Sequence, residues 1–206
     1  DTVLEFTGTT NVVNPDNESY YLRWQVDEVY VLRPTDFPDP FNDVPDPYYF
    51  STEVDPQRIS LFSGENVSIN EIGSKILARR PFDYSFLDKH FFFIQTYSMT
   101  QEAYEYWRQL DILTNSSGSI FDLPPGKLQS NIFNENDPDE EVLGFFEVSN
   151  MNYERIVVFR DDGPFDPPPS GCDYDPNRLS TSYPSYCLQC LPEDGCSFIR
   201  PPYFDG

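Results

Sequence analysis

The feature that most constrains the fold is a long alternating segment, Tyr20 to Arg33. Polar and apolar side chains alternate along it, which is the pattern of a half-buried β-strand. The alternation holds as far as Glu28, after which Val29 and Val31 continue it out of phase. The segment therefore predicts one long strand with a β-bulge near Asp27 or Glu28.

The rest of the chain favours further strands over a helical bundle. Of its 206 residues, 20 are proline and 17% are aromatic, a composition typical of strands and turns. Residues 34–49 hold five prolines and four aspartates, which predicts an exposed loop. Shorter strands are expected at residues 2–7, 59–62, 74–80, 90–97, 142–149 and 155–160, the last two forming a hairpin through residues 150–154.

One segment has the periodicity of a helix. Between Ser98 and Gly118, the apolar residues Ala103, Trp107 and Leu110 recur on one face. This predicts an amphipathic helix over about residues 101–114. The expected fold class is therefore α+β and mainly β, an antiparallel sheet or sandwich with one helix packed on it.

The composition changes after residue 160. Nine of the 20 prolines and all four cysteines lie in residues 161–206, which contain few apolar residues other than aromatics. We expect a β-rich domain over residues 1–160 and an irregular, disulfide-tied C-terminal annex over residues 161–206 that packs on it.

The four cysteines allow three kinds of chemistry. A redox C-x-x-C normally opens a helix, and the prolines flanking Cys187 and Cys190 disfavour one there. A zinc site is geometrically open, but the spacing lacks the paired symmetry of zinc motifs. An even number of cysteines in an acidic chain favours two disulfides, as in exported proteins. Of the three pairings we favour Cys172–Cys187 with Cys190–Cys196.

The charge is strongly negative. Thirteen basic residues face 35 acidic ones, a net charge of −22 that disfavours nucleic acids and anionic membrane surfaces as partners. Such a surface mainly keeps a protein soluble. Bound Ca²⁺ is the alternative, and no other cofactor is expected, although neither carboxylate cluster has EF-hand spacing. The candidate calcium ligands are Asp36, Asp39, Asp43 and Asp46 in one cluster, and Asp137 and Asp139 in the other.

Catalytic candidates are few. The sequence places no nucleophile beside the one histidine, His90, so we interpret it as a satisfied polar residue or a strand-edge residue. Glu147 and Glu154 lie on adjacent ends of the predicted hairpin and are the carboxylate pair that a hydrolase would use. We expect a protein that is not an enzyme.

Aromatic side chains are the better candidates for contacts with a carbohydrate, a peptide or a partner. A proline-rich loop cannot bury all the aromatic residues at its end, so some should be exposed. The candidates are Tyr48, Tyr49 and Phe50 at the end of the loop, and Tyr104, Tyr106 and Trp107 in the helix.

Several segments, in order, carry a family resemblance. They are YYLRWQVDEVYVLRP, YSMTQEAYEYWRQL, GSIFDLPPGKLQSNIFNENDPDEEVLGFFEVS, RIVVFR and PSYCLQCLPEDGCSFIRPPYF. Together they resemble the Bacteroidota lipoprotein family catalogued as Domain of Unknown Function 4249, over nearly the whole chain. The most specific part is EAYEYW followed by FD-x-PP, N-x-x-N-x-N-D-P and LGFF. Cys196 departs from the family pattern, which has a small polar residue there.

The resemblance implies a lipid-anchored outer-membrane protein facing the cell surface. It implies an acylated cysteine and a β-sandwich-like domain upstream of this sequence, and no established catalytic residue. The partner that it implies is a SusC-like TonB-dependent receptor. We therefore expect a non-enzymatic accessory subunit that docks on such a transporter and captures or gates its substrate. The alternatives are a structural or assembly subunit of a larger outer-membrane complex and, third, a secreted hydrolase.

Overall fold

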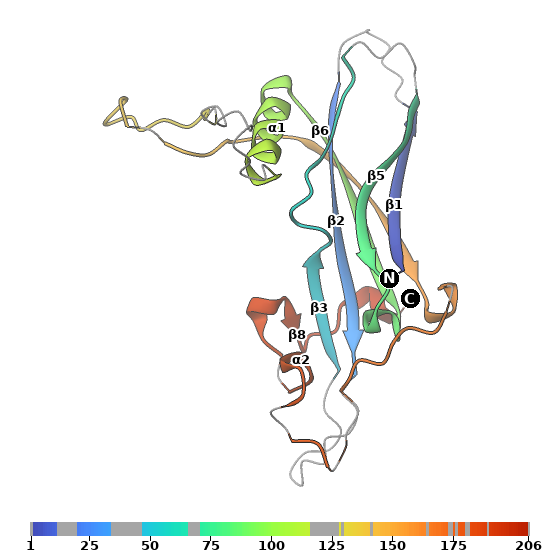
Figure 1. Ribbon diagram of the computed structural model, residues 1–206. Coiled ribbons are helices and arrows are strands. Elements are labelled where there is room, and N and C mark those ends of the chain that lie inside the picture. The colour runs from blue at the N-terminus through green and yellow to red at the C-terminus, as the bar shows by residue number, and fades with distance from the viewer. Residues whose placement is uncertain are drawn as a thin grey trace, which may run out of the picture.

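The computed structural model describes residues 2–11, 20–33, 47–65, 71–115, 128, 130–140, 142–163, 165–172, 175, 177–179, 182–188 and 190–205. Its strands are β1 (Val3–Asn11), β2 (Tyr21–Leu32), β3 (Tyr48–Glu53), β4 (Ser60–Ser63), β5 (Glu71–Pro81), β6 (His90–Met99), β7 (Asn150–Val158) and β8 (Cys196–Ser197). The helices are α1 (Gln101–Asn115) and the short α2 (Ser185–Leu188). The mainly β fold with one main helix is confirmed (Figure 1).

Strand β2 is the axis of the larger sheet. Its neighbours give the order β7-β6-β2-β3-β8, and β4 also pairs with β2. The register against β6 is continuous from Tyr21 opposite Met99 to Tyr30 opposite His90, so the predicted bulge is wrong. Val29 lies in phase with Asp27, and the apparent phase slip arises because both faces of β2 are buried from Glu28 onward.

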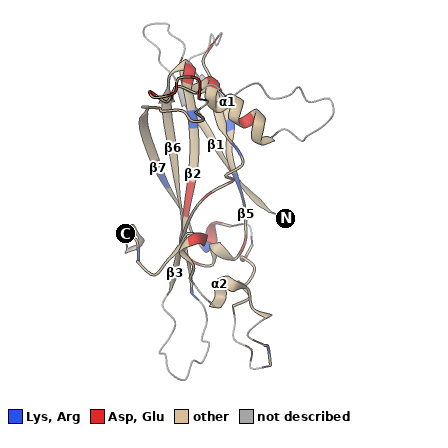
Figure 2. Cartoon of the chain, turned by 90° about the vertical axis from the view of Figure 1, so that its left-hand side faces the viewer, with Lys and Arg blue, Asp and Glu red and all other residues tan. Residues whose placement is uncertain are grey.

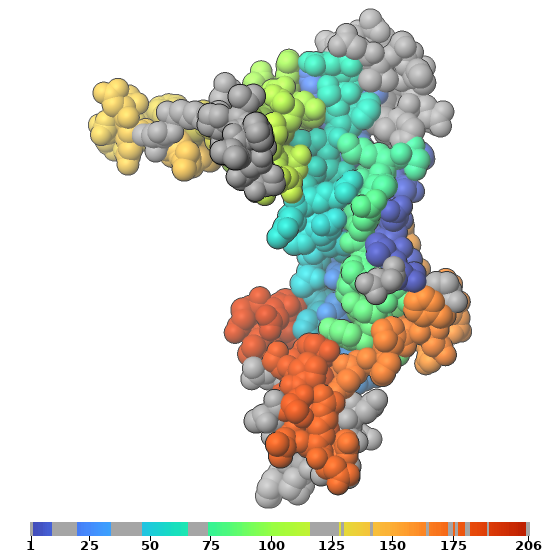
Figure 3. Space-filling view, in the orientation of Figure 1, coloured from blue at the N-terminus to red at the C-terminus, as the bar shows by residue number. Residues whose placement is uncertain are grey.

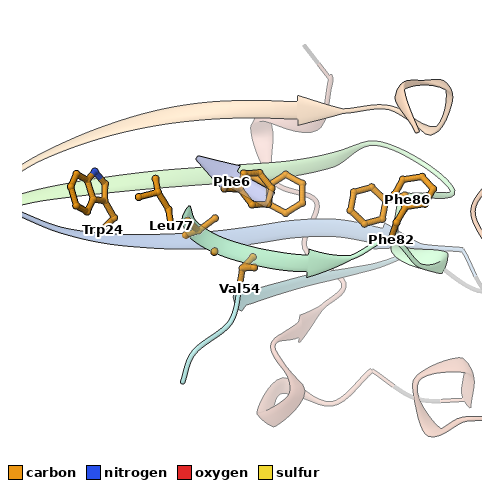
Figure 4. Packing of buried hydrophobic residues seen from close by; sticks show 9 residues of the cluster. Phe6, Trp24, Val54, Leu77, Phe82 and Phe86 are labelled. Atoms are coloured by element: carbon orange, nitrogen blue, oxygen red, sulfur yellow. The ribbon is translucent and has the colours of Figure 1, made fainter. Parts of the chain in front are cut away.

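One face of this sheet, called here the inner face, is covered by β1 and β5. These two strands pair antiparallel with each other and form a second layer. The rings of Phe6 from β1 and Phe92 from β6 lie 4.5 Å apart, so the two layers meet in an aromatic core (Figure 4). The buried members of this core are Phe6, Trp24, Val26, Val54, Leu77, Ala78, Phe82, Phe86 and Phe92.

By the described residues, the opposite face of the sheet, called here the outer face, is covered only at its two ends. At one end, Tyr21 and Met99 pack against Ala103 of α1. At the other end, Val29 and Val31 pack with Phe91 and with the C-terminal Phe204. Between these two clusters β2 presents polar side chains. These side chains form part of the candidate site.

The cysteine-rich residues pack on the inner face at the C-terminal end of β2. Cys172 and Cys187 join Tyr30 and Leu32 of β2 in one buried cluster. The disulfides pair Cys172 with Cys187 and Cys190 with Cys196, at S–S distances of 2.12 and 2.07 Å. This is the pairing that we favoured. A short helix, α2, does contain Cys187, contrary to our expectation of none, but Cys187 is bonded to Cys172 and no C-x-x-C dithiol exists.

A glycine sets how closely the second disulfide loop approaches the sheet. Gly195 adopts φ 75°, and its carbonyl oxygen accepts a hydrogen bond from the backbone N–H of Ser51. A Cβ at Gly195 would clash with the carbonyl oxygen of Ser51. The residue is therefore required both by the left-handed turn and by the contact that lets β8 pair with β3.

The predicted hairpin of residues 142–149 and 155–160 is wrong. Residues 142–149 form no strand, and β7 starts at Asn150, within the predicted turn. Strand β7 pairs along its whole length with β6, not with residues 142–149. An apolar sequence needs a neighbouring strand to become part of a sheet, and residues 142–149 lie beyond the end of β6.

Candidate functional site

The polar part of the outer face forms a ladder of hydrogen bonds across β2 and β6. Gln25 Nε2 donates to Asp27 Oδ1 over 3.0 Å, and Gln95 Nε2 donates to the other carboxylate oxygen. Tyr97 OH donates to Gln95 Oε1. The strand register causes this arrangement, because it places Gln25 opposite Gln95 and Arg23 opposite Tyr97. The ladder fixes these side chains and leaves Arg23 at its end.

Arg23 is held between two aromatic rings. Its guanidinium carbon lies 4.3 Å from the ring centroid of Tyr97 and 4.3 Å from that of Trp107. Each cation–π contact of this kind contributes about 0.5–1 kcal/mol when exposed and more when desolvated. The two rings come from β6 and α1, so tertiary packing, not local sequence, orients the guanidinium.

Trp107 is itself fixed by the helix and by Glu147. The Thr100 hydroxyl accepts a hydrogen bond from Ala103 N–H, which helps α1 to begin directly after β6. Ala103 is buried against Tyr21, so α1 lies close to the sheet. Trp107 Nε1 then donates to Glu147 Oε2 over 2.7 Å.

Two cavities lie on either side of the Arg23–Trp107 stack. One, of about 300 Å³, is bounded by β2, α1 and the segment between β3 and β4, and we call it the strand-break cavity. The other, of about 400 Å³, is bounded by Tyr97, Tyr106 and residues 145–147. Both include Arg23 and Trp107 in their walls. Arg23 is therefore available to a ligand from two sides.

An interruption in one strand makes the strand-break cavity. Strands β3 and β4 both pair with β2, but residues 54–59 leave the sheet between them. Asp55 has φ 54° and Pro56 has no N–H to donate, so neither suits a regular ladder. The displaced residues Pro56 to Ile59 form one wall of the cavity. A further cavity of about 470 Å³ lies on the other side of this segment, against Lys75 and Asp111.

Glu53 is the one acidic residue in the described lining of the strand-break cavity. Burial raises the pKa of Glu53, the charge of Asp27 raises it further, and Arg23 partly opposes the rise. Asp27 and Glu53 are directly opposite each other on β2 and β3. Two like charges so placed destabilise a sheet, which is a cost that a purely structural surface would avoid.

A second feature is an extended segment that we call the arm, residues 130–140 and 142–149. It projects sideways beyond α1, as the yellow part of Figures 1 and 3 shows. Phe133, Leu143 and Val148 are 72%, 71% and 78% exposed. The adjoining strand β7 is an edge strand, and its Met151 and Tyr153 are exposed as well. Exposed apolar side chains gathered in this way mark an interaction surface.

The arm and the start of β7 are also acidic. Between residues 130 and 154 the chain has seven Asp or Glu residues and no Lys or Arg. Figure 2 shows acidic residues, in red, gathered at the end of the molecule where α1 and the arm lie. A partner for this surface should therefore present apolar groups beside basic ones.

His90 lies in a buried polar network on the inner face. Its Nε2 lies 2.9 Å from Glu28 Oε2, an oxygen that also accepts from Arg80 Nε over 2.6 Å. Arg80 in turn pairs with Asp83 over 2.8 Å. The His90 ring stacks between Phe86 and Phe92, with both centroid distances 4.3 Å.

The network is organised for stability. Burial lowers the pKa of His90, and Glu28 only partly opposes this, so the ring is neutral and donates from Nε2. Burial acts to raise the pKa of Glu28, but the hydrogen bond from His90 and the charge of Arg80 outweigh it and the pKa is lowered. His90 is fully buried, with Nδ1 unpartnered among the described residues, and faces no cavity found in that part of the chain. It is a buried core residue bonded to Glu28 through Nε2, not a strand-edge one.

The predicted ligand-contact residues lie in the core instead. Tyr48, Tyr49 and Phe50 are buried in β3, so the prediction that they are exposed is wrong. The exposed loop was expected to reach residue 49, but β3 starts at Tyr48, where the C-terminal segments cover both faces. Phe198 packs edge-on against Tyr48, and Phe204 packs edge-on against Tyr49.

The other predicted site residues are not brought together. Glu147 lies in the 400 Å³ cavity and is bonded to Trp107, whereas Glu154 is on β7 and is not part of that cavity. Asp36, Asp39, Asp43 and Asp46 lie outside the described residues. Asp137 and Asp139 are exposed, and Asp137 Oδ1 accepts from the backbone N–H of Asp139, as in a turn. No group of three or more His, Cys, Asp or Glu side chains suited to a metal occurs among the described residues.

The sequence did not single out Arg23. The signal was present, since Arg23 is a cation in the middle of an alternating strand. However, its two aromatic neighbours are separated from it by 74 and 84 positions of chain, so no local pattern links them. Of the helix aromatics, Trp107 and Tyr106 do reach the site, whereas Tyr104 packs on Tyr21.

Comparison with known proteins gives a match to a family model. A family model described as a domain of unknown function, DUF4249, matches residues 4–155. No curated protein and no solved structure matches the chain. Within the described residues, no helix has both the length and the apolar composition needed to cross a membrane.

Proposed function

Because the chain belongs to the DUF4249 family, we propose that it is a non-enzymatic accessory subunit of an outer-membrane complex. It is held at the cell surface by a lipid anchor outside this sequence and docks on a SusC-like TonB-dependent receptor. The observation that carries this proposal is the arm, whose apolar side chains are exposed in the isolated chain. Exposed apolar patches of this kind mark sites of interaction with other proteins.

The chemistry of the arm favours a protein partner over a lipid or nucleic acid. Its exposed apolar side chains can enter a groove, and the acidic residues around them repel phosphate groups. The adjoining edge of β7 runs for nine residues without a bulge in its pairing to β6, and it contains no Pro or Lys. Natural edge strands usually carry such protections, and β7 has only the charged side chains of Glu154 and Arg155, so this weakly protected edge favours a covering partner.

The same surface defines the partner's side of the interface. The receptor should offer an apolar groove bordered by Lys or Arg side chains. Charge pairing at such a rim speeds association and makes it dependent on salt. Substrate capture or gating would then follow from the position of the docked subunit beside the barrel.

The test is a pull-down from outer membranes with the full-length, lipidated protein. The triple variant Phe133→Ser, Leu143→Ser and Val148→Ser removes apolar contacts from the arm. A matched control, Leu179→Ser with Ile199→Ser, removes side chains that are 75% and 80% exposed at the other end of the molecule. We expect the arm variant to lose the receptor barrel, identified by mass spectrometry, and the control to retain it.

Two outcomes would contradict the proposal. Equal recovery of the barrel by both variants would show that the arm is not the docking surface. Recovery of a secretion or assembly complex in place of a TonB-dependent receptor would favour the alternative, a structural or assembly subunit.

A further inference from the structure

Arg23 has no carboxylate partner among the described residues, although the chain is strongly acidic. Arg79, Arg80 and Arg108 each form an ion pair with a carboxylate, whereas Arg23 forms none with a described residue. Its one hydrogen bond to a described residue, Nη1 to Gln25 Oε1, is 3.5 Å long and therefore weak. Its Nε is buried and has no partner in the described part of the chain.

Such a group is costly unless something accepts its hydrogen bonds. Leaving a buried donor unsatisfied costs about 1–3 kcal/mol, and more when the donor is charged. The stacking of Tyr97 and Trp107 keeps the guanidinium in one orientation and so prepares it for a planar acceptor. A carboxylate is the acceptor that matches the fork of a guanidinium.

Of the two cavities that include Arg23, the strand-break cavity is the one that favours binding of an anion. Its described lining includes two arginines, Arg23 and Arg58, and one carboxylate residue, Glu53, and Arg58 Nη2 also donates to the backbone oxygen of Ile76. In the 400 Å³ cavity the charge of Glu147 balances that of Arg23. The net positive charge of the strand-break cavity is small, and the chain as a whole carries −22, so a monoanion suits it better than a phosphate or a polyanion.

The apolar residues of the cavity wall indicate what the uncharged part of the ligand should be. Trp107 and Leu110 of α1 and Ile59 of the strand break supply apolar side chains to this wall. Its volume of about 300 Å³ is at the lower end for small-molecule sites. We propose that this cavity binds a small monocarboxylate with a flat apolar body, whose carboxylate pairs with Arg23 and whose body packs between Trp107 and Ile59. The site goes beyond the proposed docking function and does not depend on it.

The test uses two probes that differ only in charge, 3-phenylpropionate and 3-phenylpropionamide. Trp107 borders the cavity, so binding should change the intrinsic tryptophan fluorescence. We expect saturable binding of the carboxylate and binding of the amide at least tenfold weaker, because a charge-assisted hydrogen bond is lost. The variant Trp107→Phe should lose the part of the signal that comes from Trp107 and keep the part from Trp24, the other tryptophan, which also borders the cavity.

Substitution of Arg23 provides the second arm of the test. Arg23→Gln should weaken the carboxylate about ten- to hundredfold and leave the amide nearly unchanged. Arg23→Lys should be intermediate, because an ammonium keeps the charge but not the planar fork. The control Arg79→Gln removes an exposed arginine that pairs with Glu5 in the other layer, and it should change nothing.

Absence of saturable carboxylate binding, or equal binding of acid and amide, would overturn the proposal. Carboxylate binding and the comparison of acid with amide are both measured on the unsubstituted protein. These two measurements therefore test the proposal even if Arg23→Gln fails to fold. The arm triple variant contains no wall residue of this cavity and should bind the probe normally. Loss of docking and loss of carboxylate binding are thus separately measurable.

Discussion

The two ends of β2 are built differently, although they belong to one strand. From Val29 to Leu32 every side chain is buried, since the annex covers the inner face and Phe204 the outer face. From Arg23 to Asp27 only the inner face is buried, and the outer face carries the polar ladder. We call these two regions the sealed end and the open end.

We infer that one end of β2 mainly stabilises the fold and that the other end mainly binds ligands or partners. The sealed end contains the disulfides, the Glu28–His90–Arg80 network and a segment of β2 that is buried on both faces. The open end has two cavities, a guanidinium that no described carboxylate pairs with and, next to it, the exposed arm. Substitutions at the sealed end should therefore affect folding, and substitutions at the open end should affect binding.

The sharpest comparison is the same substitution at both ends. Phe91 is 1% exposed and Phe133 is 72% exposed. Phe91→Ala should lower the free energy of unfolding by about 3–5 kcal/mol through lost burial and a cavity. Phe133→Ala should change it by less than about 0.5 kcal/mol. Urea unfolding followed by circular dichroism measures both, and equal losses would refute the division.

A second comparison uses two Glu–Arg pairs. Glu28→Gln leaves Arg80 buried without its carboxylate and should cost about 3 kcal/mol, the lower end for breaking a buried pair, because the amide still accepts hydrogen bonds. Glu5→Gln breaks an exposed pair with Arg79 and should cost less than about 1 kcal/mol. Similar midpoints in urea for the two variants would mean that burial does not govern these pairs.

The disulfides give the next effect. Replacing Cys172 and Cys187 by Ser should cost about 3 kcal/mol, and replacing Cys190 and Cys196 about 2 kcal/mol, because the first bridge closes the longer loop. Carboxylate binding at the open end should survive both replacements. Thiol titration of the denatured, unreduced protein should find no free thiol, since no cysteine is free in the structure.

The pH dependence of stability is the smallest effect. Because burial lowers the pKa of His90 below its ordinary 6.5, the unfolded chain binds a proton that the folded protein does not as the pH falls. The contribution of His90 to the free energy of unfolding is therefore complete above about pH 6.5. Below that pH it declines, by at most about 1.4 kcal/mol per pH unit. The lowered pKa of Glu28 adds a loss in the same direction at more acidic pH.

The variant His90→Phe isolates the contribution of the histidine. It keeps a flat ring between Phe86 and Phe92 but cannot titrate. Chemical unfolding between about pH 5 and 7 should show a shallower decline than in the unsubstituted protein. An unchanged slope would exclude His90 as the source.

Local patterns predicted the elements but not their partners. The alternation of residues 20–33 identified β2, and the helical period identified α1, because both signals lie within a few residues. The hairpin of residues 142–149 was wrong, because an apolar run does not show whether a strand is available to pair with it. Tyr48, Tyr49 and Phe50 were misplaced for the same reason, since the residues that cover them are over 100 positions away.

The sequence by itself determined the class of fold, the central strand, the helix, the acidic surface and the means to staple the C-terminal residues. These follow from period, composition and the number of cysteines, which are local or additive properties. Only the tertiary structure decided which parts of β2 are covered, that Arg23 lies between Tyr97 and Trp107, and that the arm is left exposed. Those outcomes depend on contacts between distant segments, whose free energies are realised only when the whole chain has packed.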